Sequence, residues 1–242
     1  PGKDKGKDMI LLTKMDKRPP NWTFVFAVDV ARSGSVSADY SVAIGIAYNS
    51  ISQEKQICYF WRSKGLKISE QAEEIAEISK NFNHPYLLVE QNNMGQDMID
   101  ELTDKYNVNV EAITTGAHTT GKNIKKEELI RFLISAFEHE KITIPRGDEY
   151  SREQMSILED ELTKFCAIPT PAGNELFQGV GAHDDCVIAL ALANRATQTV
   201  GIPFAVTLGP GRTQAGGVYS ALLQATRGES DIEKMIKLGI IK

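Results

Sequence analysis

The chain has 242 residues, of which 42% are hydrophobic, and carries a formal net charge of −5. This composition predicts one soluble globular domain with a sizeable core and some appended chain. No apolar run approaches the roughly 20 residues that span a bilayer, and no secretory signal is recognisable, so membrane partners are not expected. The three cysteines are widely spaced and odd in number, which argues against a zinc site or a disulfide framework and favours a reducing cytoplasm. A negative charge is atypical of nucleic-acid binding, although a local basic face can still bind DNA.

The first part of the chain combines a polar leader with three β-rich runs. Residues 1–20 are rich in Lys, Asp and Gly and end in a Pro-Pro pair, which predicts a linker or a remnant of a longer chain. The runs at about 22–30, 41–48 and 56–62 contain many Val, Ile, Phe and Tyr residues. Gly, Ser and Asn residues separate them, so an antiparallel meander is expected.

Helical and strand patterns alternate after this meander. The expected elements are helices at 68–83, 95–106, 122–140, 151–164 and 183–197, with strands at 86–90, 108–113 and 141–144 and a β-hairpin formed by 165–168 and 176–180. This order predicts an α/β domain over residues 21–200, with a mixed central sheet and helices on both faces. Residues 201–242 are expected to be a tail with a short helix.

Carboxylates occupy the ends of two apolar strands and the start of an apolar helix. Asp29 follows the run 24–28, Glu90 follows 86–89, and Asp184 and Asp185 precede the apolar helix. A bare carboxylate among apolar groups costs several kcal/mol, so each must be hydrated, paired or bound to metal. Hard divalent cations take oxygen ligands. If these acids meet at one edge of the sheet, the sequence predicts metal-dependent phosphodiester chemistry.

The aspartates also have simpler interpretations, whereas such an interpretation is weaker for Glu90, whose strand is otherwise apolar. Asp29 and Asp39 could be turn residues, and capping of a helix explains one of Asp184 and Asp185. His183 could be a surface turn residue, or could activate water or contact a phosphate. Capping accounts for each acid singly, but it does not account for their joint placement at strand ends.

A second motif, at residues 116–122, has the spacing of a phosphate-binding loop between a strand and a helix. Asn123 stands where that motif needs a Ser or Thr hydroxyl for magnesium, so an ATP site is not expected here. A run of lysines can be a solvated helix face or can contact DNA phosphates. The candidate DNA-binding residues are Arg32, Lys122, Lys125 and Lys126.

Four motifs together resemble a known family. They are Val-Asp-Val-Ala-Arg-Ser-Gly at 28–34, Ala-Asp-Tyr-Ser at 38–41, Leu-Val-Glu-Gln-Asn-Asn-Met-Gly at 88–95 and His-Asp-Asp-Cys-Val-Ile-Ala-Leu-Ala-Leu-Ala at 183–193. In this order they resemble the nuclease domain of the terminase large subunit of tailed bacteriophages, over residues 21–198. The resemblance implies an RNase H-like fold.

The resemblance also implies roles for individual acids. Asp29 matches the metal ligand on the first strand, Glu90 the acid on the fourth strand, and Asp184 or Asp185 the final acid. Asp39 matches an auxiliary acid, and His183 is a second auxiliary candidate. The expected cofactors are two Mg²⁺ or Mn²⁺ ions, roughly 3.5–4 Å apart, with Asp29 bridging both.

The implied activity is endonucleolytic cleavage of double-stranded concatemeric viral DNA during genome packaging. The expected partners are DNA, the packaging ATPase domain of the same protein, the portal and the small terminase subunit, in the host cytoplasm at the procapsid portal. Two alternatives remain open at this point. One is an RNase H-like nuclease of the junction-resolvase type, and the other is a non-catalytic module that docks on the portal or a partner.

Overall fold

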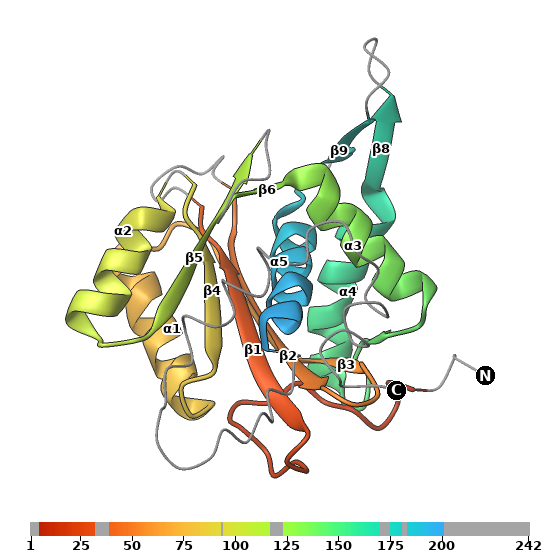
Figure 1. Cartoon of the computed structure of the whole chain (residues 1–242), viewed down its shortest axis with the longest axis horizontal. Coiled ribbons are helices and arrows are strands. Elements are labelled where there is room, and N and C mark those ends of the chain that lie inside the picture. Colours follow the sequence, from red (N-terminus) through yellow and green to blue (C-terminus); the bar gives the residue numbers. More distant parts are fainter. Residues whose placement is uncertain are drawn as a thin grey trace, which may run out of the picture. The chain divides into compact units, whose positions relative to one another are not determined.

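The computed structural model describes residues 5–31, 39–92, 94–116, 123–169, 175–180 and 183–200. The strands are β1 (Trp22–Asp29), β2 (Ser41–Asn49), β3 (Lys55–Ser63), β4 (Tyr86–Glu90), β5 (Val110–Gly116), β6 (Asn123–Lys125), β7 (Ile142–Thr143), β8 (Phe165–Pro169) and β9 (Glu175–Gly179). The helices are α1 (Ile68–Asn81), α2 (Gly95–Asp100), the π-helical η1 (Glu101–Lys105), α3 (Lys126–Glu138), α4 (Glu149–Lys164) and α5 (Asp185–Val200). Figure 1 shows their arrangement.

The central sheet has seven strands in the order β6-β5-β4-β1-β2-β3-β7. The first three strands pair antiparallel, whereas β4 is parallel to β1, and β5 and β6 continue that parallel arrangement. Strand β7 pairs parallel to β3 at the opposite edge. The predicted mixed sheet is therefore confirmed, and β1 lies at its centre. Strands β8 and β9 form a separate antiparallel hairpin, as predicted.

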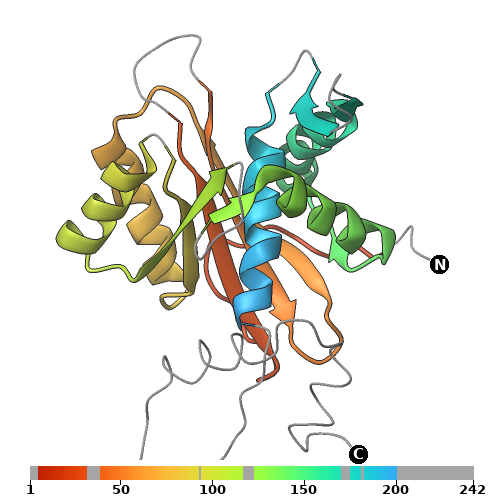
Figure 2. The same ribbon diagram turned by 45° about the horizontal axis from the view of Figure 1, so that its top comes forward.

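Helices cover both faces of this sheet (Figures 1 and 2). The alternation of side chains along β1 divides the core accordingly, because successive residues of a strand point to opposite faces. Phe26 and Val28 pack with Ile75 of α1 in one cluster, whereas Val25 and Ala27 pack in the other cluster with residues of α3, α4 and α5. Helices α1 and α2 thus cover one face, and α3, α4 and α5 the other.

Helix α5 is apolar along almost its whole length and is buried against the sheet, as its sequence predicts. It contacts β1, β2 and β4. Because both the helix and the strands are fixed by this packing, the start of α5 is held at the end of the sheet where β1 and β4 finish (Figure 2).

The third predicted helix is shorter than expected. It begins at Lys126, because residues Asn123–Lys125 form the short edge strand β6 beside β5. Ile124 is buried there, and the pattern of three residues is too short to distinguish a strand from the first turn of a helix. Helix α4 begins before its predicted start, where Asp148 caps it by accepting a 2.8 Å hydrogen bond from the Ser151 amide.

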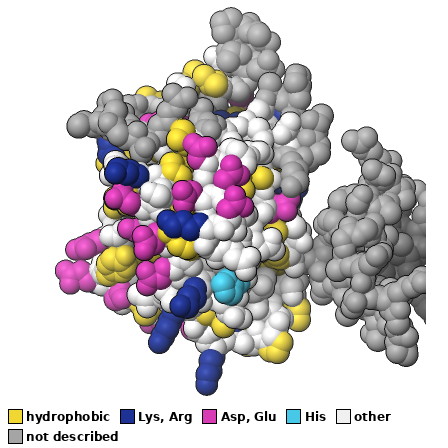
Figure 3. All heavy atoms as spheres, turned by 90° about the vertical axis from the view of Figure 1, so that its left-hand side faces the viewer, with side chains coloured by type: hydrophobic (Ala, Val, Ile, Leu, Met, Phe, Trp, Pro, Cys, Tyr) yellow, Lys and Arg dark blue, Asp and Glu magenta, His cyan; other side chains and the backbone are white. Residues whose placement is uncertain are grey.

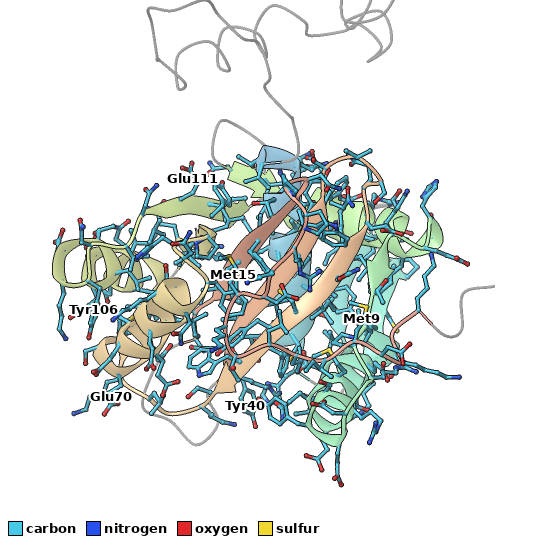
Figure 4. All side chains as sticks on the ribbon, turned by 90° about the horizontal axis from the view of Figure 1, so that it is seen from below. Met9, Met15, Tyr40, Glu70, Tyr106 and Glu111 are labelled. Atoms are coloured by element: carbon cyan, nitrogen blue, oxygen red, sulfur yellow. The ribbon has the colours of Figure 1, made fainter. Side chains whose placement is uncertain are left out.

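The described part of the N-terminal segment packs against the domain. Leu11 is buried, and the amide of Leu12 donates to the Cys58 carbonyl at 2.7 Å. The amide of Met15 donates to the Asn81 carbonyl at the end of α1. Figure 4 shows the path of this segment, with Met9 beside α4 and Met15 beneath the strands.

Two expected features lie outside the described residues: the tail at 201–242, and residues 170–174 between β8 and β9. The same holds for most of the loop with phosphate-binding spacing, at 117–122. None of the helices in the described ranges has the length and apolar character needed to cross a membrane.

Candidate metal centre

Asp29 and Glu90 end two adjacent parallel strands. Val28 of β1 pairs in register with Val89 of β4, so the two acids are the next residues on neighbouring strands. The pKa of Asp29 is raised well above its ordinary value, first by burial and then by the charge of Glu90 and a hydrogen bond with it. The charges of Asp185 and Asp184 raise it further. The structure therefore brings all four acids together at one end of the sheet.

Side chains of two neighbouring segments hold Glu90. Asn92 donates to its Oε1 at 2.8 Å, and the hydroxyl of Thr115 on β5 donates to the same oxygen. The Asn92 amide also donates to the Thr115 carbonyl at 2.8 Å, which links the β4–α2 turn to β5. Glu90 is only 8% exposed, so these contacts fix the direction of a buried carboxylate.

Asp185 is the more enclosed of the two acids at the start of α5. It is 8% exposed, and its Oδ2 accepts a 2.9 Å hydrogen bond from the Tyr40 amide. Burial raises the pKa of Asp185 to about 6, and the charges of Asp39 and Glu161 also raise it. The Tyr40 hydrogen bond and His183 act in the opposite direction.

Asp39 and His183 form a second group around Asp185. The Nδ1 atom of His183 lies 3.7 Å from Asp39 Oδ1 and 3.6 Å from Asp185 Oδ2. One ligand atom from each of the three residues lies within 4.8 Å of the other two, a spacing that could hold a metal ion. The ring of Tyr40 packs edge-on against His183, with centroids 5.0 Å apart. Asp185 thus lies beside Asp39 and His183, and its charge also acts on Asp29.

Asp184 lies at the rim of the same site. Its Oδ2 is 3.0 Å from the ammonium of Lys126, and both side chains are partly exposed. Lys126 is the first residue of α3, so the start of α3 at this position places its charge beside the acids. Lys125 is exposed on β6, and the other two candidate DNA-binding residues, Arg32 and Lys122, lie outside the described residues.

The donor set fits a divalent cation. The site consists of carboxylate oxygens with one imidazole, which suits Mg²⁺ or Mn²⁺. The ammonium of Lys126 pairs with one of these acids, Asp184. Burial and then repulsion by the neighbouring acids raise the pKa of Asp29, and a bound cation would relieve that repulsion. The residues that could hold metal are Asp29, Asp39, Glu90, His183, Asp184 and Asp185.

Two residues that support the acids, Thr115 and Glu161, were not identified from the sequence. Thr115, which binds Glu90, has no distinguishing sequence pattern. Glu161, which lies behind Asp185, does have one: it is an acid three residues after the buried Leu158, on the apolar face of α4. A buried charge on an otherwise apolar helix face indicates a specific partner.

Known proteins resemble the chain in sequence and in fold. No family model matches the chain. The curated terminase large subunits of Thermus phage G20c and Thermus virus P23-45 are each 25% identical to it over 198 residues, or 78% of this chain. The chain spans about a third, 36%, of the length of these relatives.

The chain covers a larger share of several solved structures than of the curated relatives. The magnesium-bound large terminase nuclease of phage G20c matches 79% of this chain and 95% of its own, with a TM-score of 0.56 and 24% identity. The large terminase nuclease domain of Thermus phage P74-26 matches with a TM-score of 0.54 and 24% identity. The P22 large terminase nuclease domain matches 77% of this chain and 86% of its own, with a TM-score of 0.53 at 10% identity.

The chain has the fold of a phage large-terminase nuclease domain. The resemblance predicted from the four sequence motifs is confirmed, as is the RNase H-like mixed sheet. In this terminase nuclease fold, the acids at the ends of β1 and β4 and at the start of α5 meet at the carboxyl ends of the strands, where open α/β sheets commonly bind ligands.

Proposed function

We propose that the chain is a divalent-metal-dependent endodeoxyribonuclease domain that acts in phage DNA packaging. The observation that carries the proposal is the convergence of Asp29, Glu90, Asp184 and Asp185 at one end of the sheet, where burial and then the neighbouring acids raise the pKa of Asp29. The fold likeness and the curated relatives support the same conclusion. The related nuclease of phage G20c has been solved with magnesium and with cobalt, which supports a divalent cation here.

The residues divide into two groups that share Asp185, and this favours two ions. One group is Asp29, Glu90 and Asp184, and the other is Asp39 and His183. Bound ions would activate the attacking water and stabilise the leaving oxygen of the phosphodiester. Thr115 and Asn92 keep Glu90 directed at the site. A metal ion bound to Asp184 would displace the ion pair between Asp184 and Lys126. The Lys126 ammonium would then be available to contact a DNA phosphate.

The surface charge favours one direction of approach for DNA. The outer face of α1, α2 and η1 carries many acidic side chains, with fewer basic side chains among them (Figure 3). Those that are exposed are Glu70, Glu73, Glu74, Glu77, Asp97, Asp100 and Asp104. DNA phosphates are repelled by such a face. We therefore propose that the duplex approaches the end of the sheet beside α3, where Lys125 and Lys126 lie.

The proposed natural substrate and partners rest on the likeness to the curated relatives. The curated relatives are terminase large subunits that are much longer than this chain. We propose that the substrate is double-stranded concatemeric viral DNA, and that the domain works with a packaging ATPase domain of the same protein, the portal and the small subunit. Its place of action would be the host cytoplasm at the procapsid portal.

Plasmid cleavage in Mn²⁺ tests the proposal. Wild-type protein should nick and linearise supercoiled plasmid, and Asp29→Asn should abolish cleavage. Asp160→Asn is a matched control, because Asp160 is an exposed acid of α4 paired with Lys164. Undiminished cleavage by Asp29→Asn would refute the site. Preferential cutting of a four-way junction over linear duplex would favour a resolvase, and absence of both cleavage and Mn²⁺ binding would favour a docking module.

A further inference from the structure

A buried ionic network lies directly behind Asp185. Glu161 of α4 is 3% exposed, and its Oε2 accepts a 2.8 Å hydrogen bond from the backbone amide of Cys186. Its Oε1 is 3.1 Å from the Cys186 thiol and accepts a 3.0 Å hydrogen bond from Nη2 of Arg62. Cys186 follows Asp185 in the first turn of α5, so Glu161 anchors the backbone that carries the acid.

The other end of the network reaches the same acid by a second route. The guanidinium of Arg62, on β3, stacks on the ring of Tyr40 with its central carbon 3.4 Å from the ring centroid. The amide of Tyr40 donates to Asp185 Oδ2 at 2.9 Å. Arg62 therefore holds Tyr40, the residue before β2, and the amide of Tyr40 holds the carboxylate of Asp185. Two elements thus position Asp185: Glu161 of α4 holds the backbone beside it, and Tyr40 holds its carboxylate.

The simplest alternative is that Glu161 only caps α5. A carboxylate at a helix start is favourable for that reason alone. Capping would not require the guanidinium, whose burial is costly: the Arg62 side chain is 17% exposed, and its Nε has no hydrogen-bond partner within the described residues. Buried ion pairs can often be replaced by apolar residues without loss of stability, so stability alone does not explain this pair.

We propose that Glu161 and Arg62 are positioning residues that set the backbone and carboxylate of Asp185 for metal binding. This inference rests on the proposed function, because it assumes that Asp185 is a metal ligand. Residues behind metal ligands orient them, and their loss commonly weakens metal affinity about 10- to 100-fold. Glu161 binds the backbone next to Asp185, and Arg62 packs on Tyr40, whose amide binds Asp185. We therefore expect the loss of either residue to act mainly on Asp185.

The test is Mn²⁺ affinity, measured by isothermal titration and by electron paramagnetic resonance of free Mn²⁺. Glu161→Gln keeps the shape of the side chain but removes its charge, and it should raise the Mn²⁺ Kd about tenfold or more. Glu159→Gln is the matched control, since Glu159 lies on the same helix but forms an exposed ion pair with Arg146. The control should leave the Mn²⁺ Kd unchanged. A folded Glu161→Gln protein that binds Mn²⁺ within twofold of wild type would overturn the inference.

Arg62→Lys is a second, independent test of the positioning role, which can be used if Glu161→Gln does not fold. Lysine keeps the positive charge but cannot stack as a plane on Tyr40, so the Mn²⁺ Kd should rise while the metal-free melting temperature changes little. An unchanged Kd in folded Arg62→Lys protein would contradict the proposal. Asp29→Asn separates the two levels of inference. If wild type binds no Mn²⁺, the proposed function fails; if only Asp29→Asn loses Mn²⁺ and both network variants bind normally, only the positioning role fails.

Discussion

Asp29 and Glu90 occupy equivalent positions on adjacent parallel strands, each one residue beyond the paired Val28 and Val89. Parallel pairing fixes this arrangement, because a change of register would move every side chain of the strand. Burial and the neighbouring Glu90 carboxylate then raise the pKa of Asp29. The sheet thus holds two like charges together, at a cost in stability that a bound cation would offset.

The first prediction concerns the pH dependence of stability without metal. Burial raises the pKa of Asp185 to about 6, above its ordinary 3.8. Between these pH values the folded state retains a proton that the unfolded state has released, so the free energy of unfolding falls as the pH rises. Asp185→Asn should therefore be more stable than wild type at pH 8 in EDTA, by up to about 3 kcal/mol, and the advantage should disappear toward pH 4.

Thermal unfolding in EDTA across this pH range measures the effect. Saturating Mn²⁺ provides the internal control, because the metal should stabilise wild type and have a much smaller effect on Asp185→Asn. If Asp185→Asn proved less stable than wild type at pH 8 in EDTA, the charged carboxylate of Asp185 would not destabilise the folded state, and the prediction would be wrong.

The second prediction concerns the support of Glu90. Thr115→Val keeps the β-branched shape on β5 but removes the hydroxyl that donates to Glu90 Oε1. We expect the Mn²⁺ Kd to rise about tenfold, because an orienting contact to a metal ligand is lost. Thr163→Val is the control, since the Thr163 hydroxyl donates to the Asp160 carbonyl on the surface of α4. Equal Mn²⁺ affinity in all three proteins would contradict the assignment.

The sequence was sufficient to predict the part of the fold that places the acids. The apolar runs before Asp29 and Glu90 and the apolar helix after Asp185 can be buried only if all three pack at the sheet, and the structure shows this. The antiparallel pairing of the first three strands also followed from their spacing and turn residues.

Other features depend on contacts between distant segments and could not be predicted locally. Asp184 and Asp185 are indistinguishable in the sequence, but the turn of α5 buries one beside Tyr40 and leaves the other at the rim with Lys126. Strand β6 forms because β5 offers an edge, not because three residues have a strong preference. Thr115 supports Glu90 only through the pairing of β4 with β5.

The third prediction concerns the turn after Glu90. A Cβ atom at Gly95 would lie 1.7 Å from the Glu90 carbonyl oxygen, a backbone atom that no side-chain rotation can move. Gly95→Ala should therefore displace the β4–α2 turn, lower the free energy of unfolding by about 1–3 kcal/mol and weaken Mn²⁺ binding. Gly116→Ala at the end of β5 is the control, because nothing lies within 4 Å of its Cβ position. Similar melting temperatures for the two variants would show that the turn adapts.

The last prediction separates metal binding from DNA contact at Lys126. In the absence of metal its ammonium pairs with Asp184 in a partly exposed ion pair, which is worth about 0–1 kcal/mol. Lys126→Ala removes a competitor for that carboxylate, so the Mn²⁺ Kd should fall by up to about fivefold. Cleavage should nevertheless decline, with a higher KM for DNA and a shallower dependence on salt, because one phosphate contact is lost. Lys164→Ala, which breaks the exposed pair with Asp160, should change neither quantity. A variant at Lys126 that bound Mn²⁺ more weakly would instead place this lysine among the residues that hold the acids in position.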